Sequence, residues 1–92
     1  MTANRAARAK GWREDRYRQV IELLIGERRR HGMTQAQLAD KLGRQQHFIS
    51  RYETGERRLD IAEFADVAVA LGLSPAKIIA EIWEIPSAKG VD

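Results

Sequence analysis

The sequence of 92 residues contains no cysteine and only two histidines, His31 and His47. Disulfide bonds and thiolate metal sites are therefore excluded, and two imidazoles are too few to suggest another metal centre. No apolar stretch approaches the ~20 residues that cross a bilayer, and residues 1–15 hold no apolar block typical of a secretion signal. These absences predict a cytoplasmic protein without metal, cofactor or membrane contact.

Recognisable catalytic motifs are also missing. No Ser/His/acid set, paired-carboxylate motif, phosphate-binding loop or metal-ligand spacing stands out in so short a chain, so we predict that the protein is not an enzyme. The chain does have apolar residues, which make up 43% of the total. This share is enough for a single core, and it predicts one compact domain held together by packing alone.

Positive charge is concentrated in the first part of the chain. Residues 1–58 contain 14 Lys and Arg against 7 Asp and Glu, a balance of +7, whereas residues 59–92 contain 2 against 6, a balance of −4. A basic side suits a polyanionic partner, because each phosphate that it neutralises releases counterions. The charge distribution alone is equally compatible with a solvated surface that happens to be uneven.

Glycines and capping residues divide the sequence into helices, and no strand is needed. Four glycines follow apolar-periodic segments, where a helix readily ends in a left-handed residue; they are Gly32, Gly43, Gly55 and Gly72. Three capping patterns mark helix starts; they are Thr34 with Gln37, Asp60 with Glu63, and Ser74 with Pro75. The predicted helices are 16–31, 34–42, 45–54, 60–71 and 75–84.

The chain is predicted to have three parts. They are a basic, disordered extension over residues 1–15, a helical domain over residues 16–85 and a flexible tail over residues 86–92. The basic residues of the extension have two interpretations, an arm attracted to phosphates or a leader without a role; they are Arg5, Arg8, Lys10 and Arg13. The predicted core consists of Val20, Leu24, Met33, Leu38, Ala39, Leu42, Ile49, Tyr52, Leu59, Phe64, Val67, Ala68, Leu71 and Ile78.

The helix predicted over residues 45–54 has one apolar and one polar side. At about 100° per residue, Phe48, Ile49 and Tyr52 share an apolar arc that must be buried. The opposite arc contains Gln46, His47, Ser50, Arg51 and Thr54. A glutamine can pair with adenine, and arginine and histidine can donate to guanine acceptors. Taken alone, this arc fits a base-reading surface and an ordinary solvated surface equally well.

The preceding helix, 34–42, is short, and only Gly43 and Arg44 separate it from the next, which describes a helix-turn-helix. From an arginine late in the first helix, the sequence runs through T-Q-x-x-L-A-x-x-L-G and I-S-x-x-E-x-G to a closing A-L-G. This pattern, in TQAQLADKLGRQQHFISRYETGERRLDIAEFADVAVALGLSP, resembles the Cro/repressor-type helix-turn-helix domain of the XRE family over residues 17 to about 80. The resemblance implies an all-α, five-helix, lambda-repressor-like fold.

The same resemblance implies a bacterial or phage-type transcriptional regulator, in the manner of a repressor, that binds double-stranded DNA. Helix 45–54 would read the major groove in a sequence-specific way. The expected base-reading residues are Gln46, His47 and Arg51, with Gln45 and Ser50 as secondary candidates.

Other residues are expected to hold the DNA backbone or the fold. Gln35 matches a family glutamine that touches a phosphate and braces the recognition helix, with a merely tolerated polar residue in the first helical turn as the alternative. The arginines that flank this helix are expected on the sugar-phosphate backbone, with a solvated loop as the alternative; they are Arg44, Arg57 and Arg58. Arg28 and Glu53 match a family ion pair between the first and third helices, so their expected role is structural.

Two positions depart from the commoner family pattern. Arg44-Gln45 replaces the usual Ser or Thr near the start of the recognition helix, and Phe48 occupies a position that is more often small and polar. The base preference therefore cannot be copied from a relative. The place of Phe48 on the apolar arc favours packing over contact with a thymine methyl group.

The last predicted helix carries more apolar side chains than a short helix needs to dock on four others; they are Ile78, Ile79, Ile82, Trp83 and Ile85. Core closure explains them, and so does a homodimer interface, which would suit a two-fold operator. The alternative function is an antitoxin-like or other protein-interaction module that binds a protein partner through residues 75–85.

Overall fold

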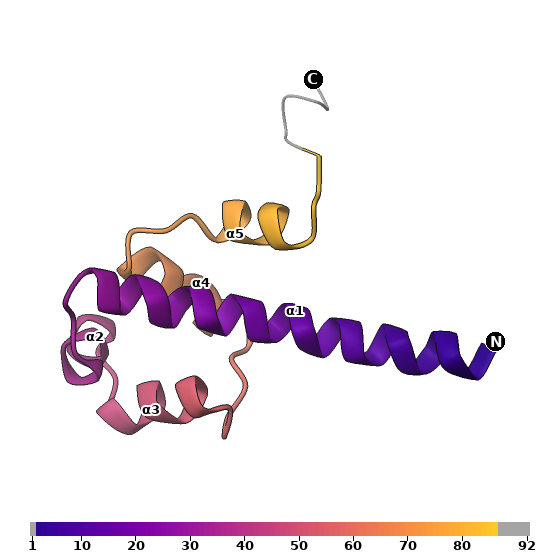
Figure 1. Cartoon of the computed structure of the whole chain (residues 1–92). Helices are drawn as coiled ribbons and strands as arrows, with labels where there is room; N and C mark the ends of the chain where they lie inside the picture. Colours follow the sequence, from indigo (N-terminus) through magenta and orange to yellow (C-terminus); the bar gives the residue numbers. More distant parts are fainter. Residues whose placement is uncertain (1, 87–92) are drawn as a thin grey trace.

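The described chain folds as five helices, which Figure 1 shows in sequence order. The computed structural model describes the backbone of residues 2–86 and the side chains of residues 15–86. The helices are α1 (Thr2–Arg30), α2 (Gln35–Leu42), α3 (Gln46–Thr54), α4 (Ile61–Ala70) and α5 (Pro75–Ile82). Residues 2–86 contain no strand, in agreement with the all-α prediction.

Helix α1 begins at Thr2, whereas the sequence predicted a start near residue 16. The absence of a clear cap suggested the later start, but the segment before residue 16 is rich in Ala and Arg, which are strong helix formers, and contains no proline. The division of the chain into residues 1–15, 16–85 and 86–92 stays a prediction. The predicted basic arm and the tail after residue 86 fall outside the described side chains; the arm residues are Arg5, Arg8, Lys10 and Arg13.

Helices α2, α4 and α5 begin at their predicted caps, and α2 and α3 end at their predicted glycines, whereas α5 ends at Ile82 and was predicted to reach residue 84. Both capping boxes are present, Thr34 with Gln37 and Asp60 with Glu63, and the Ser74 hydroxyl accepts a hydrogen bond in the first turn of α5. The four glycines predicted to end helices all have a left-handed φ, between 67° and 88°. Any residue with a Cβ would pay roughly 1–2 kcal/mol to adopt such a φ, which explains why glycine occupies these positions.

All five helices contribute to one core. Its buried apolar residues are Val20, Ile21, Leu24, Leu38, Ala39, Phe48, Ile49, Tyr52, Phe64, Val67, Ala68, Leu71 and Ile78. Met33, Leu42 and Leu59 were predicted there but are only partly buried and pack against its edge. Ile21 was missed because the segment from Val20 to Ile25 has five apolar residues around one exposed glutamate, Glu22, so their arc is too wide for helical periodicity to select its buried centre.

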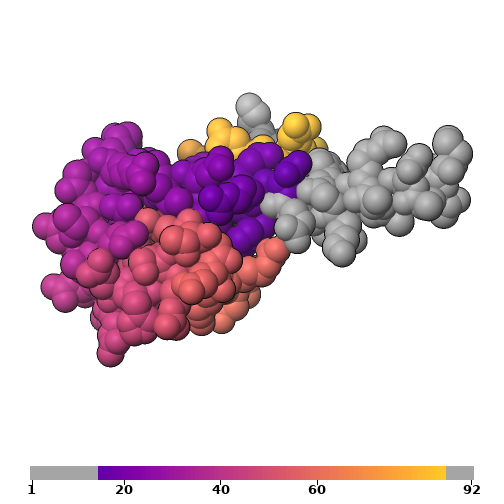
Figure 2. Space-filling view, turned by 60° about the horizontal axis from the view of Figure 1, so that its bottom comes forward, coloured from indigo at the N-terminus to yellow at the C-terminus, as the bar shows by residue number. Residues whose placement is uncertain are grey.

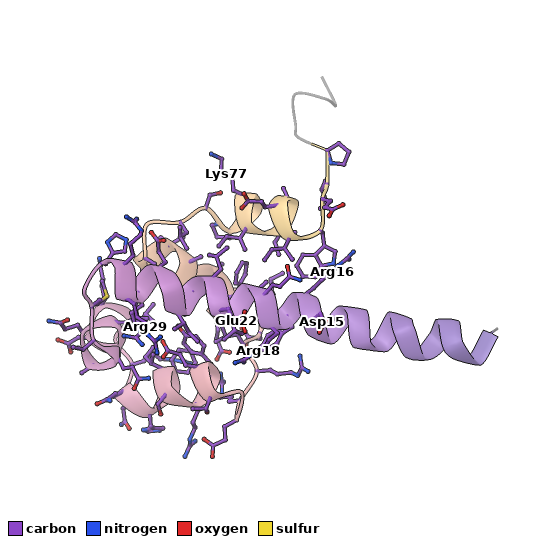
Figure 3. The ribbon with its side chains drawn as sticks, in the orientation of Figure 1. Asp15, Arg16, Arg18, Glu22, Arg29 and Lys77 are labelled. Atoms are coloured by element: carbon purple, nitrogen blue, oxygen red, sulfur yellow. The ribbon has the colours of Figure 1, made fainter. Side chains whose placement is uncertain are left out.

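Helix α5 closes the core on the side of α1 that lies opposite α3 (Figure 1). Ile78 is buried, and Ile79, Ile82 and Trp83 pack against the core, so core closure accounts for four of the five apolar side chains. Arg16 projects from α1 toward α5, as Figure 3 shows, with its guanidinium carbon 5.3 Å from the centre of the Trp83 ring. Among the five, Ile85 is the exposed one, at 51%.

None of the helices in the described part of the chain combines the length and the apolar character that spanning a bilayer requires.

Candidate nucleic-acid interface

Helices α2 and α3 meet at a tight turn built around Gly43. The amide of Gly43 donates to the Asp40 carbonyl at 3.1 Å and that of Arg44 donates to the Ala39 carbonyl at 2.8 Å, so the carbonyls at the end of α2 are satisfied. Gln45 then adopts an extended conformation as the N-cap of α3. The turn sets α3 on the surface beside α2, and both contribute to one continuous face with the segment that follows α3 (Figure 2).

Burial of one side of α3 decides which residues point outward. Phe48, Ile49, Tyr52 and Glu53 are buried. The residues predicted to read bases lie on the other side: Gln45, Gln46, His47 and Arg51 are exposed and Ser50 is half-buried. The only carboxylate of α3 is buried, so the outward side of the helix carries no negative charge.

The ion pair predicted between α1 and α3 is present, and the structure shows that it is buried. Arg28 donates from Nε to Glu53 Oε2 at 2.7 Å and from Nη2 to Glu53 Oε1 at 3.0 Å. The third nitrogen, Nη1, donates to the Met33 carbonyl oxygen at 2.7 Å. Arg28 is 7% exposed and Glu53 8%, and the hydrogen bond to Glu53 is the main cause that raises the pKa of Arg28. This pair fixes α3 against α1 by charge and geometry together.

Gln35 extends the same network to the surface of α3. Its Nε2 donates to Glu53 Oε1 at 2.9 Å, and its Oε1 accepts a long hydrogen bond of 3.4 Å from Gln46 Nε2. The resemblance predicted a glutamine that braces the recognition helix, and the structure places Gln35 in this position. Its contact with a phosphate stays a prediction.

A second cluster of arginines and a carboxylate lies on the side of α3 that faces α4. Glu63, at the start of α4, accepts two hydrogen bonds from Arg57, at 2.7 and 2.9 Å, and one from Arg44 at 3.2 Å. Its Oε1 also accepts from the Asp60 amide at 2.9 Å, which is one half of the capping box. The Arg57 hydrogen bonds are the main cause that lowers the pKa of Glu63 to about 2, so this carboxylate stays ionised near neutral pH.

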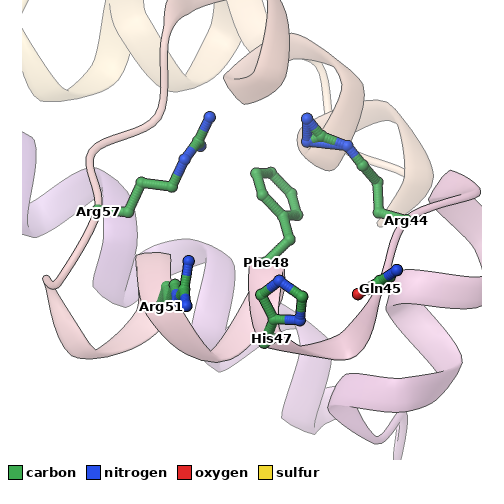
Figure 4. Close-up of a pocket in the computed structure, with 6 residues that line it drawn as sticks. All are labelled: Arg44, Gln45, His47, Phe48, Arg51 and Arg57. Atoms are coloured by element: carbon green, nitrogen blue, oxygen red, sulfur yellow. The ribbon is translucent and has the colours of Figure 1, made fainter.

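The Phe48 ring stands between these two arginines (Figure 4). The guanidinium carbon of Arg44 is 4.0 Å from the ring centre, and that of Arg57 is 5.1 Å from it. Both distances are within the range of a cation–π interaction. The ring and the two cations border an open hollow of about 280 Å³ that is also lined by Gln45, His47 and Arg51.

The segment after α3 is tied to α1 by Tyr17, whose hydroxyl accepts a hydrogen bond of 3.1 Å from the Leu59 amide. The guanidinium carbon of Arg58 lies 4.6 Å from the centre of the Tyr17 ring. Arg18, which projects from α1 in Figure 3, has its Nη1 3.9 Å from the position that a Cβ would take on Gly55. These contacts hold the segment with Arg57 and Arg58 beside the end of α3.

Comparisons with known proteins agree with this geometry. The family model of a helix-turn-helix domain matches residues 6–78. The chain is also similar to a solved structure described as an XRE-family like protein from Pseudomonas syringae pv. tomato str. DC3000, with 35% sequence identity and a TM-score of 0.78 over 86% of this chain and 96% of that chain. The comparison with curated proteins found no match.

The chain belongs to the XRE-type helix-turn-helix family. The predicted family and the predicted five-helix, lambda-repressor-like fold are thereby confirmed. As a member of this family, the XRE-type protein is a DNA-binding regulator.

The structure of this XRE-type protein brings most of the predicted site residues to one face. The candidate base-reading residues lie on the outward side of α3, while Arg44 and Arg57 lie together toward α4 rather than at two separate ends. Sequence reasoning missed Glu63 as a partner of these arginines, because its capping role already explained it. No group of three or more possible metal ligands occurs among the described residues.

Proposed function

We propose that this XRE-type protein is a sequence-specific repressor that inserts α3 into the major groove of double-stranded DNA. The observation that carries the proposal is the outward side of α3, which is exposed, polar and free of carboxylates, while the opposite side is fixed by a buried ion pair. An interface with phosphates requires such a surface, and a rigid support for the helix improves its positioning on the duplex.

In this proposal, Gln46, His47 and Arg51 contact base edges, with Gln45 and Ser50 as secondary contacts. Glutamine offers a donor and an acceptor to adenine, and arginine offers paired donors to guanine. The side chains of His47 and Arg51 make no hydrogen bond or ion pair within the described residues, so binding DNA would break no internal contact of theirs. Gln35, Arg44, Arg57 and Arg58 are assigned to the sugar-phosphate backbone.

The proposal includes a homodimer on a two-fold operator, because one short helix reads few base pairs and symmetric half-sites double the contact. It also includes a cytoplasmic location and no enzymatic activity or cofactor. A protein partner bound through residues 75–85, as in an antitoxin, is the second candidate. It has less support, because most of the apolar side chains of α5 are used within the chain.

The test is binding to the DNA upstream of the protein's own coding sequence, measured by fluorescence anisotropy against a duplex of random sequence. The wild type is compared with the double variant Gln46→Ala, Arg51→Ala. The matched control is the double variant Gln19→Ala, Lys77→Ala, which also removes one side-chain amide and one positive charge. Lys77 belongs to α5, which lies across α1 from α3 (Figure 3).

Loss of preference for the upstream DNA in the first variant, and not in the control, is the expected result. An equal affinity of the wild type for both duplexes at every salt concentration would overturn the proposal of sequence-specific binding. If the wild type shows no preference between the duplexes and a second protein co-purifies with it, the protein-partner function is favoured.

A further inference from the structure

Two arginines of the DNA-facing side share a single carboxylate in this protein. Arg44 precedes α3 and Arg57 follows it, yet both donate to Glu63 on α4. Their side chains remain 37% and 40% exposed, whereas that of Glu63 is 13% exposed. The negative charge is therefore on the inner side of the cluster and the positive charges are on the outer side.

Neither arginine uses all of its donors in these contacts. An arginine side chain has five N–H groups in a planar fork. Arg44 makes one hydrogen bond to Glu63, and Arg57 makes two to Glu63 and one of 3.4 Å to the Arg58 carbonyl. Each guanidinium can therefore bind a second anion without releasing Glu63.

Two neighbouring guanidinium groups repel each other, and this repulsion must be offset if both are to stay in place. Glu63 supplies a compensating charge between them, and the Phe48 ring supplies an attractive surface for each. Phe48 is itself held in place, because it is buried in the core and its ring centre lies 5.6 Å from that of Tyr52. The cluster of Arg44, Arg57, Phe48 and Glu63 is thus fixed before any DNA arrives, and we name it the arginine clamp.

We propose that the arginine clamp binds one stretch of the DNA backbone with both arginines at once, and that Glu63 and Phe48 are the positioning residues that prepare it. This inference rests on the proposed function and adds to it a carboxylate that supports DNA binding. Both Arg44 and Phe48 are positions where the sequence departs from the commoner family pattern.

The direction in which one substitution changes DNA affinity distinguishes this role of Glu63 from a simple effect of its charge. Removal of an acidic residue near bound DNA ordinarily strengthens binding, because the residue repels phosphates. If Glu63 positions the clamp, Glu63→Gln weakens binding although it makes the protein more basic. Gln at this position can still complete the capping box with Asp60, so the start of α4 is retained.

The experiment measures affinity for a random-sequence duplex over a salt series for the wild type, Glu63→Gln and the control Asp66→Asn. Asp66 is exposed on α4, one turn after Glu63, and it forms no ion pair within the described residues, so the control changes the net charge equally. A random duplex reports backbone contacts without a known operator. Circular dichroism during heating shows whether each variant is folded.

The expected result is a severalfold loss of affinity for Glu63→Gln, with a salt dependence whose slope is smaller by about 0.9 for each phosphate that the variant no longer neutralises. Asp66→Asn keeps the wild-type slope and binds as well as the wild type or better. The loss of affinity caused by Arg44→Ala is then smaller in the Glu63→Gln background than in the wild type, because an arginine that Glu63 no longer holds in position contributes less to binding.

Equal or tighter binding by folded Glu63→Gln, with an unchanged slope, would overturn the clamp and leave the proposed function intact. A wild type that binds the random duplex but does not prefer its upstream DNA would overturn sequence-specific reading and leave the clamp intact. A wild type without affinity for any duplex would overturn both.

Discussion

Two arginine–carboxylate clusters flank α3, and they differ mainly in burial. Behind the helix, Arg28 and Glu53 are 7% and 8% exposed and hydrogen-bond to each other through two nitrogens. On the side facing α4, Glu63 holds Arg44 and Arg57, whose side chains are 37% and 40% exposed. The chemistry of the groups is the same, but the buried arginine has no route to a ligand, whereas the exposed ones have free donors at the surface.

This difference separates stability from binding along a single helix. A charge pair that is removed from water is costly to break, because the remaining partner is left buried and uncompensated. An exposed pair contributes little to stability, since water and salt screen it. We therefore expect substitutions in the buried cluster to act mainly on folding, and substitutions in the exposed cluster or on the outward side of α3 to act mainly on DNA binding.

The largest expected effect comes from Glu53→Gln, which keeps the volume of the side chain but leaves the buried charge of Arg28 without an opposite charge. We expect the free energy of unfolding to fall by roughly 3–5 kcal/mol. Chemical denaturation followed by circular dichroism measures it. Glu56→Gln, at an exposed position shortly after α3, serves as the control and should change stability by less than about 0.5 kcal/mol. If Glu53→Gln and Glu56→Gln lost equally little stability, the proposed difference in stability between the buried and the exposed cluster would be contradicted.

The next effect is on sequence reading. Arg51→Ala removes an exposed side chain of α3 that has no internal partner among the described residues, so stability should change by less than about 0.5 kcal/mol. The preference for the upstream DNA over a random duplex should fall by about 1–3 kcal/mol, the range for one bidentate base contact. Competition binding at a fixed salt concentration measures this preference. A uniform loss of affinity for both duplexes would instead assign Arg51 to the DNA backbone.

Local patterns in the sequence predicted the parts of this interface that depend on near neighbours. Capping boxes and left-handed glycines place helix ends through residues within one turn of each other, and the structure has them at Thr34, Asp60 and Gly43. The polar arc of α3 follows from helical periodicity alone. The resemblance to a family added the ion pair between Arg28 and Glu53, which no local pattern would have indicated.

The parts that the sequence did not predict depend on contacts between distant residues. Glu63 contacts Arg44 across nineteen positions, and its capping role as the third residue of α4 gave no sign of a second role. Phe48 was expected to pack inward, but its position between two cations required knowing where α4 lies. The start of α1 was misplaced for a different reason, because helix propensity spread over many residues outweighed one absent cap.

Gln35 joins the buried cluster to the outward side of α3, so its substitution should affect both stability and DNA binding by intermediate amounts. Gln35→Ala removes hydrogen bonds to Glu53 and to Gln46, and we expect a loss of stability of about 1–2 kcal/mol, since one of these bonds is to a charged group. Affinity for DNA should fall as well, because Gln46 is no longer braced. Gln19→Ala, at an exposed position on α1, is the control for loss of an amide. An effect on stability alone would place Gln35 entirely with the buried cluster.

The smallest expected effect is a dependence of stability on pH that belongs to the exposed cluster. The hydrogen bonds from Arg57 lower the pKa of Glu63 from 4.5 to about 2, so folding favours its ionised form. The stabilisation is complete above pH 4.5 and is lost as the pH falls toward 2. The wild type and the Glu63→Gln variant share all other carboxyl groups, so the difference between their melting temperatures reports on Glu63 alone. We expect that difference to shrink between these two pH values, and a constant difference would show that the two arginines do not favour the ionised carboxylate.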